Sequence, residues 1–216
     1  PKLAASPITF TMPQATATWP RQVIAVVQNE QDPSVPTMGI MMIQNSPREN
    51  YHVEYMVTLE PDATVPTVAP ANVGSALVPP DSKLLLISPD QLSAAYGSVL
   101  TQGTDSPYYG LFDFTADTLV TQVGKDYKAQ KAASVSEHAS LEFSQNAGSG
   151  APLGLATLDS GAIVTVSLNE IETVRPTQAG ASVSPEGQAK ILSGISTSTS
   201  GVESTYGMEL AFYVPP

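Results

Sequence analysis

Residues 51–60 read YHVEYMVTLE, the clearest strand pattern in the chain. The odd positions are apolar, whereas His52, Glu54 and Thr58 take even positions together with Met56. Side chains of a strand point alternately to opposite faces, so this period of two predicts a strand with one face against a core. Residues 38–44 read MGIMMIQ and are apolar at nearly every position, which predicts a central strand covered on both faces.

Short apolar runs separated by turn residues continue this pattern along the chain. Further strands are expected at residues 23–28, 83–87, 108–115, 118–123, 134–143, 162–168 with an extension over 170–174, and 208–214. Ser88-Pro89 followed by Gly97, and Ser184-Pro185 followed by Gly194, have the residues that begin and end short helices. Residues 61–80 hold five prolines and are expected to form a long loop. The prediction is an all-β fold, a single jelly-roll-like β-sandwich with two short loop helices.

Composition limits the classes of protein that fit. A chain of 216 residues with 42% hydrophobic residues can bury a sizeable core, and all-β chains of this length are commonly one domain. The absence of cysteine excludes disulfides and thiolate metal sites. A net charge of −11 argues against a general phosphate-binding surface. Residues 1–5 carry one lysine, and no apolar run follows them, so no leader and no membrane insertion are expected.

Residues 1–20 are predicted to form an extended N-terminal arm ahead of one β-sandwich domain over residues 21–216. Ile8, Phe10 and Met12 alternate with threonines, while Pro7, Pro13 and Pro20 interrupt the run. Proline removes a backbone donor, so this segment belongs at the edge of a sheet. It either lies along another subunit, with Ile8, Phe10 and Met12 as assembly contacts, or forms the first edge strand of its own sheet.

Few residues suggest chemistry. His52 and Glu54 share a strand face, which suits an exposed polar surface better than a metal pair, and His138 follows Glu137. Without a nucleophile, base and orienting group in a recognisable pattern, no catalytic site, metal or cofactor is expected. Lys125, Lys128 and Lys131 recur every three residues and are candidates for contact with a nucleic acid or an acidic neighbour, although a solvated segment is the more usual outcome. Aromatic residues that would suit a carbohydrate-binding face are Trp19, Tyr108, Tyr109, Phe112 and Phe114.

The whole-chain pattern of arm, proline-rich loop, short strands and low charge resembles the jelly-roll coat proteins of icosahedral viruses. The resemblance implies a non-enzymatic coat or decoration subunit, located in the virion, that assembles with copies of itself and other shell subunits. The chain lacks the basic arm of many coat proteins, so contact with nucleic acid is expected to be weak or absent. Two alternatives stay open: a subunit of a bacterial surface pilus assembled by donor-strand exchange, and a carbohydrate-binding module.

Overall fold

A computed structural model describes the chain except residues 1–5, 17, 29–35, 61–62, 116 and 136; for residues 6–8 and 28 it describes the backbone alone. The chain is predominantly β, with antiparallel strands in two sheets, which confirms the predicted class in its general form. The strands are β1 (Ser6–Thr11), β2 (Arg21–Gln28), β3 (Met38–Gln44), β4 (His52–Thr58), β5 (Ala139–Ala147), β6 (Leu153–Ala156), β7 (Ala162–Pro176) and β8 (Val202–Val214). The helices are α1 (Pro89–Gln102), α2 (Thr118–Val123), α3 (Lys125–Ser134) and α4 (Gly187–Ser193), with 3-10 turns η1 (Gly103–Asp105) and η2 (Tyr109–Leu111).

The chain groups into two compact units, each built from separate segments, and the expectation of one domain over residues 21–216 stays a prediction. The first unit comprises Pro1–Ser93, Gly148–Ser167 and Glu209–Pro216. The second comprises Ala94–Ala147 and Leu168–Met208. The long strands β7 and β8 therefore contribute residues to both units.

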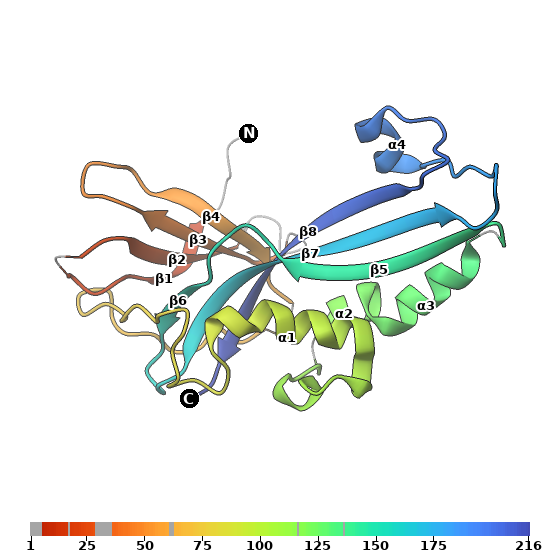
Figure 1. Cartoon of the computed structure of the whole chain (residues 1–216). Coiled ribbons are helices and arrows are strands. Elements are labelled where there is room, and N and C mark those ends of the chain that lie inside the picture. The colour runs from red at the N-terminus through yellow and green to blue at the C-terminus, as the bar shows by residue number, and fades with distance from the viewer. Residues whose placement is uncertain (1–5, 17, 29–35, 61–62, 116, 136) are drawn as a thin grey trace. The chain divides into compact units, whose positions relative to one another are not determined.

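The first unit has two β layers with a core between them. Strands β1, β2, β3 and β4 lie side by side in that order, each antiparallel to the next (Figure 1). Ile24, Met41 and Tyr55 from this sheet pack against Leu153 and Leu155 of β6, and these five side chains are almost completely buried. Tyr55 also donates a hydrogen bond from its hydroxyl to the Ala151 carbonyl, at 2.7 Å.

In the second unit, helices accompany long strands. β5 pairs antiparallel with the C-terminal part of β7, from Ala139 opposite Pro176 to Ala147 opposite Leu168. Helix α1 passes through Gly97, where the sequence pattern predicts its end. Gly97 is buried, and a Cβ there would lie 2.8 Å from Oε1 of Gln145, so the glycine permits close packing and does not stop the helix.

Three predicted strands are wrong. Residues 83–87 form bends, and their run of leucines lacks the alternation of a strand. Residues 108–115 contain η2 instead of a strand, and residues 118–123 form helix α2. The side chain of Asp117 accepts hydrogen bonds from the backbone nitrogens of Leu119 and Val120, so an N-cap outweighs the strand preference of the β-branched residues in α2. The sequence pattern also predicts neither helix α3 nor the short strand β6.

In this chain the predicted arm takes part in its own sheet, while contact with another subunit stays a prediction. Residues 6–11 form β1, which pairs with β2 at the edge of its own sheet. Thr11 is buried there, with 2% of its surface exposed. Met12 follows the strand, and its carbonyl accepts a hydrogen bond from the Ser75 nitrogen at 2.7 Å.

Candidate functional site

The three predicted lysines lie on α3, and the structure gives each one an acidic partner from the same chain. Lys125 Nζ lies 2.5 Å from the Asp105 carboxylate in an exposed pair. Lys128 pairs with Glu170, and Lys131 pairs with Glu172. Contact of these lysines with a nucleic acid stays a prediction, but the carboxylates already neutralise the positive charges that such contact requires.

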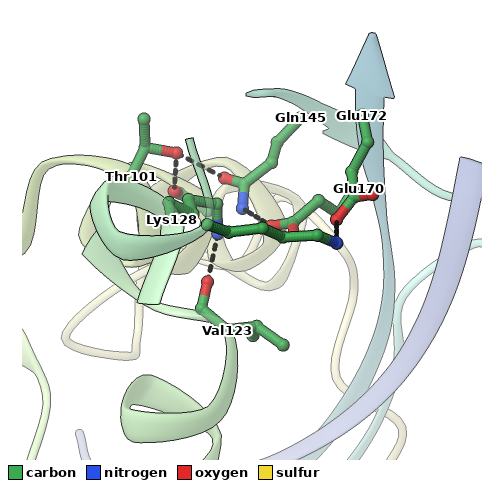
Figure 2. A network of polar contacts seen from close by, with 8 residues as sticks. Thr101, Val123, Lys128, Gln145, Glu170 and Glu172 are labelled. Carbon is green, nitrogen blue, oxygen red and sulfur yellow. Dashed lines mark hydrogen bonds and ion pairs between the residues drawn. The ribbon is translucent and has the colours of Figure 1, made fainter. Parts of the chain in front are cut away.

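The Lys128–Glu170 pair is buried, with side-chain exposures of 6% and 5%. Figure 2 shows the Lys128 amine reaching both the Glu170 carboxylate and the Val123 carbonyl, to which it donates a hydrogen bond. The amine also lies 5.6 Å from the centre of the Phe143 ring.

The network continues beyond the charged pair. Gln145 Nε2 donates to Glu170 Oε2 at 3.0 Å, and Gln145 Oε1 accepts from the Thr101 hydroxyl at 3.0 Å (Figure 2). These groups satisfy one another inside the second unit, which is the condition under which buried charge is tolerated. We therefore interpret the network as a structural cross-link between α1, α3, β5 and β7.

The ionisation of Lys131 responds to its surroundings. Burial tends to lower the pKa of Lys131, but the hydrogen bond and negative charge of Glu172 outweigh this effect, so the pKa lies above its ordinary value. Lys131 is therefore fully charged at neutral pH and held to β7.

The histidines lie in surface pairs. His52 Nε2 is 3.6 Å from the Glu54 carboxylate, and His138 Nε2 is 3.9 Å from the Glu137 carboxylate. Within the part of the chain that the structure describes, no three His, Asp or Glu side chains gather as a metal site would require.

The aromatic residues considered for carbohydrate binding contact one another. The rings of Tyr109 and Phe114 stack with centres 4.7 Å apart, and Tyr96 and Phe112 meet edge to face at 5.4 Å. Trp19 belongs to the other unit, where the Arg21 guanidinium lies 4.4 Å from the centre of its ring. Tyr108 and Tyr109 are still 40% and 36% exposed, so carbohydrate binding by these residues stays a prediction.

A different surface stands out in the first unit: the side of the β1–β4 sheet that faces away from the core, here called the outer face. Ile24, Met41 and Tyr55 point inward, so their strand neighbours point outward. Residues paired across strands share a face, and the register therefore defines three apolar outward rows beside the polar pair Arg21–Gln44. The rows are Phe10–Ala25–Ile40–Met56, Val23–Met42–Val53 and Val27–Met38–Thr58.

The outer face is apolar; its margins are exposed, whereas Val23 and Ala25 of β2 are buried, at 5% and 4%. Phe10, Val53 and Met56 at its margins expose 45%, 55% and 48% of their surfaces. Ile40 and Met42 in the middle strand are only half-buried. A continuous apolar surface of this kind on a folded chain marks an interaction site more often than chance. Phe10 is the one predicted assembly residue that lies on it; the side chain of Ile8 is outside the described residues.

The sequence misses this surface because of one irregularity. The register between β3 and β4 shifts between Met41 and Met42, so Met41 pairs with Tyr55 while Met42 pairs with Val53. Tyr55 and Val53 therefore lie on opposite faces, although simple alternation places both inside. The bulge moves Val53 onto the outer face, and the prediction that residues 51, 53, 55, 57 and 59 share one buried face is wrong at Val53.

Comparison with known proteins identifies the family of this chain. Residues 2–216 match the family described as Domain of unknown function (DUF8094). The chain belongs to this family. It is also 31% identical over 156 residues, 72% of its length, to a protein of Streptomyces avermitilis named "Uncharacterized lipoprotein". The match spans 44% of that relative. No solved structure matches the chain.

These findings correct the functional prediction. The resemblance to viral coat proteins rests on overall pattern without a diagnostic motif, and a bacterial lipoprotein relative contradicts it. Assignment to a virion, as coat or decoration subunit, is therefore wrong. Short strands, prolines and low charge also suit exported β-proteins, which explains why the pattern alone misleads.

Proposed function

We propose that this domain is a non-catalytic association module of a bacterial surface lipoprotein, and that its outer face binds the outer face of a second copy. The observation that carries the proposal is the exposed apolar surface around Phe10, Val53 and Met56. The lipoprotein relative supports the bacterial surface location. Within the described residues no helix is long and apolar enough to cross a membrane.

The character of the face favours a second copy as its partner. Its three apolar rows contain no charged residue, and the charged Arg21 lies at one end of the face, opposite Gln44, so the rows favour a partner with an apolar surface. In the row Phe10–Ala25–Ile40–Met56 the small Ala25 stands between larger side chains, and such relief allows two faces to interdigitate. Two sheets of the same twist stack readily, and a symmetric pair uses the same patch twice.

The arrangement of β1 favours face-to-face packing over donor-strand exchange. β1 is hydrogen-bonded to β2 in its own sheet, so donation to another subunit would require it to leave. Packing through the outer face leaves every strand in place. The two layers of the first unit support a β-sandwich; the consecutive order β1-β2-β3-β4 is that of a meander, which argues against a jelly roll.

The net charge of each copy predicts how self-association should depend on salt concentration. Each copy carries −11, so two copies repel at low salt, whereas apolar burial is insensitive to screening. Self-association through the outer face should therefore strengthen as sodium chloride is added. A contact held by ion pairs would weaken instead.

The test is sedimentation equilibrium of the wild-type chain and of Met56→Lys. Burying a methionine is worth about 1.5–3 kcal/mol, and the symmetric pair contains two, so the association constant should fall at least about tenfold. Leu192→Lys is the matched control, because Leu192 is 85% exposed on α4 in the other unit. Both variants make the net charge less negative, so overall repulsion cannot explain a loss seen in Met56→Lys alone.

Methionine methyl NMR identifies the face directly. Met38, Met42 and Met56 lie on the outer face, whereas Met41 lies in the core. Signals of the first three should shift with protein concentration, and that of Met41 should not. A wild-type chain that stays monomeric at every accessible concentration and salt, or equal losses in Met56→Lys and Leu192→Lys, would contradict the proposal.

A further inference from the structure

The first unit also contains a pocket between its two β layers, separate from the outer face. Its cavity volume is about 120 Å³. The inner side of the β1–β4 sheet provides one wall and β7 and β8 provide the other. Its lining residues are Ile24, Val26, Gly39, Met41, Val57, Leu59, Ala63, Thr64, Val65, Pro66, Ile163, Thr165, Ala211, Phe212 and Tyr213.

The walls are almost entirely hydrocarbon, and Gly39 helps to create the space. Gly39 stands in the middle of β3, where a glycine weakens a strand by about 0.5–1 kcal/mol relative to alanine. A Cβ built on Gly39 would meet its nearest side-chain atom, Leu59 Cδ2, at 3.5 Å, an ordinary contact. A side chain at this position would fit, so the fold does not need the glycine for close packing. Because Gly39 has no side chain, the pocket stays open.

One polar group in the wall lacks a partner. Thr165 is 4% exposed, and among the described residues its hydroxyl oxygen has no hydrogen-bond partner. Leaving such a group buried costs about 1–3 kcal/mol, and a valine has nearly the same shape without that cost. The other hydroxyl of this wall, that of Tyr213, is already bonded to the Asp159 carboxylate at 2.6 Å. Thr165 is thus the group that a ligand oxygen would satisfy.

We propose that this pocket binds an alkyl group of about five or six carbons that carries one oxygen, with the oxygen hydrogen-bonded to Thr165. A dry cavity of roughly 150 Å³ is known to hold benzene, so 120 Å³ admits a group of comparable size. Ala63 and Thr64 are exposed, and Tyr213 is 44% exposed, so this end of the pocket reaches the surface. A longer molecule can therefore enter by its end. The same chemistry occurs in a free aliphatic alcohol and in the esterified short chain of a lipid.

Met41 serves as the reporter, because it lines the pocket and is 1% exposed. The full chain with labelled methionine methyl groups is titrated with 1-pentanol, with hexane, and with dihexanoylphosphatidylcholine below its micelle concentration. The Met41 signal should shift with 1-pentanol, while Met208 in the second unit should not. A Met41 shift at lower concentration with the phospholipid assigns the ligand to lipid, and the reverse order assigns it to a free alcohol.

Two variants with matched controls test the site itself. Thr165→Val should weaken 1-pentanol binding about tenfold, leave hexane binding unchanged, and raise the denaturation midpoint of the free protein. Thr173→Val makes the same change elsewhere on β7 and should alter neither affinity. Gly39→Val should abolish the Met41 response to both probes, whereas Gly207→Val should not, because Gly207 is exposed in β8 outside the pocket.

The outcomes separate this inference from the proposed self-association. A Met41 shift that survives in Gly39→Val, no Met41 shift with any probe, or equal effects of Thr165→Val on 1-pentanol and hexane would overturn it. If Gly39→Val fails to fold, the Thr165→Val comparison decides alone. None of these results depends on the oligomeric state, which the Met56→Lys experiment addresses separately.

Discussion

Replacing Lys128 with methionine tests whether the Lys128–Glu170 pair stabilises the second unit. The substitution removes the amine but keeps the length and apolar stem of the side chain. It leaves the Glu170 carboxylate, 5% exposed, without its cation and leaves the Val123 carbonyl without that donor. Breaking a buried ion pair from one side typically costs about 3–5 kcal/mol. A domain stable by about 5–15 kcal/mol would lose a large part of its stability.

The same helix offers a matched control. Lys125→Met removes an amine whose partner Asp105 is 74% exposed, and exposed pairs contribute about 0–1 kcal/mol. Lys128→Met/Glu170→Leu removes both charges, and such replacements are often neutral or stabilising by about 1–4 kcal/mol. The expected order of stability places Lys125→Met and the double variant near the wild type and Lys128→Met far below both.

Urea denaturation followed by circular dichroism measures these differences. Fluorescence of Trp19, the single tryptophan, reports the first unit in the same samples. Denaturation midpoints that agree between Lys128→Met and Lys125→Met would show that the Lys128–Glu170 pair is exposed in solution, and the reasoning from burial would fail. A double variant as unstable as Lys128→Met would show that the cost lies in lost packing and not in unpaired charge.

Two further predictions concern the first unit and alkaline pH. Burial raises the pKa of Tyr55, and the partners of Lys131 raise its pKa as well, so both groups favour the protonated form when folded. Their contributions to stability are complete below about pH 10 and are lost as the pH rises through the folded pKa values. The unfolding free energy should therefore fall in that range. Tyr55→Phe should make the fall with pH shallower, and an unchanged slope would contradict the assignment. Val164 is fully buried in β7, so Val164→Ala should lower the unfolding free energy by about 1–5 kcal/mol. Leu158 is 61% exposed, so Leu158→Ala should change the unfolding free energy by less than about 0.5 kcal/mol. Equal effects of the two variants in urea denaturation would place Val164 outside the core.

The strands that sequence predicts well are those with uninterrupted local signals. Residues 38–44 match β3 in both bounds, and residues 208–214 lie within β8. Helix α4 ends where expected, since Gly194 takes a positive φ of 66° as its C-cap. Residues 118–123 fail because threonine and valine favour strands locally, while the deciding contact is a single side chain, Asp117, just outside the run.

The ionic network required information that no local pattern contains. Lys128 and Glu170 are far apart in sequence, and a glutamate in a strand ordinarily indicates a solvent-facing position. A faint signal existed in the spacing. Lys128 and Lys131 lie one helical turn apart, about 4.5 Å along α3, while Glu170 and Glu172 lie about 6.6 Å apart on one face of β7. Two cations and two anions with similar separations can pair across a helix and a strand, but only after the fold has brought them together.

The prediction that β3 is covered on both faces is confirmed for its inner side and not for its outer side. β3 is apolar on both sides, and the pattern alone predicts a strand covered twice. The inner side is covered, because Met41 packs against Leu153 and Leu155. The outer side carries Ile40 and Met42, which stay half-buried, and the bulge opposite them adds Val53. Val23 and Ala25 on this side are buried within the chain itself, but the exposed parts of Phe10, Val53 and Met56 contribute little to its folding. Their presence is explained if the cover comes from a second molecule, which is why we place the function of this domain on that face.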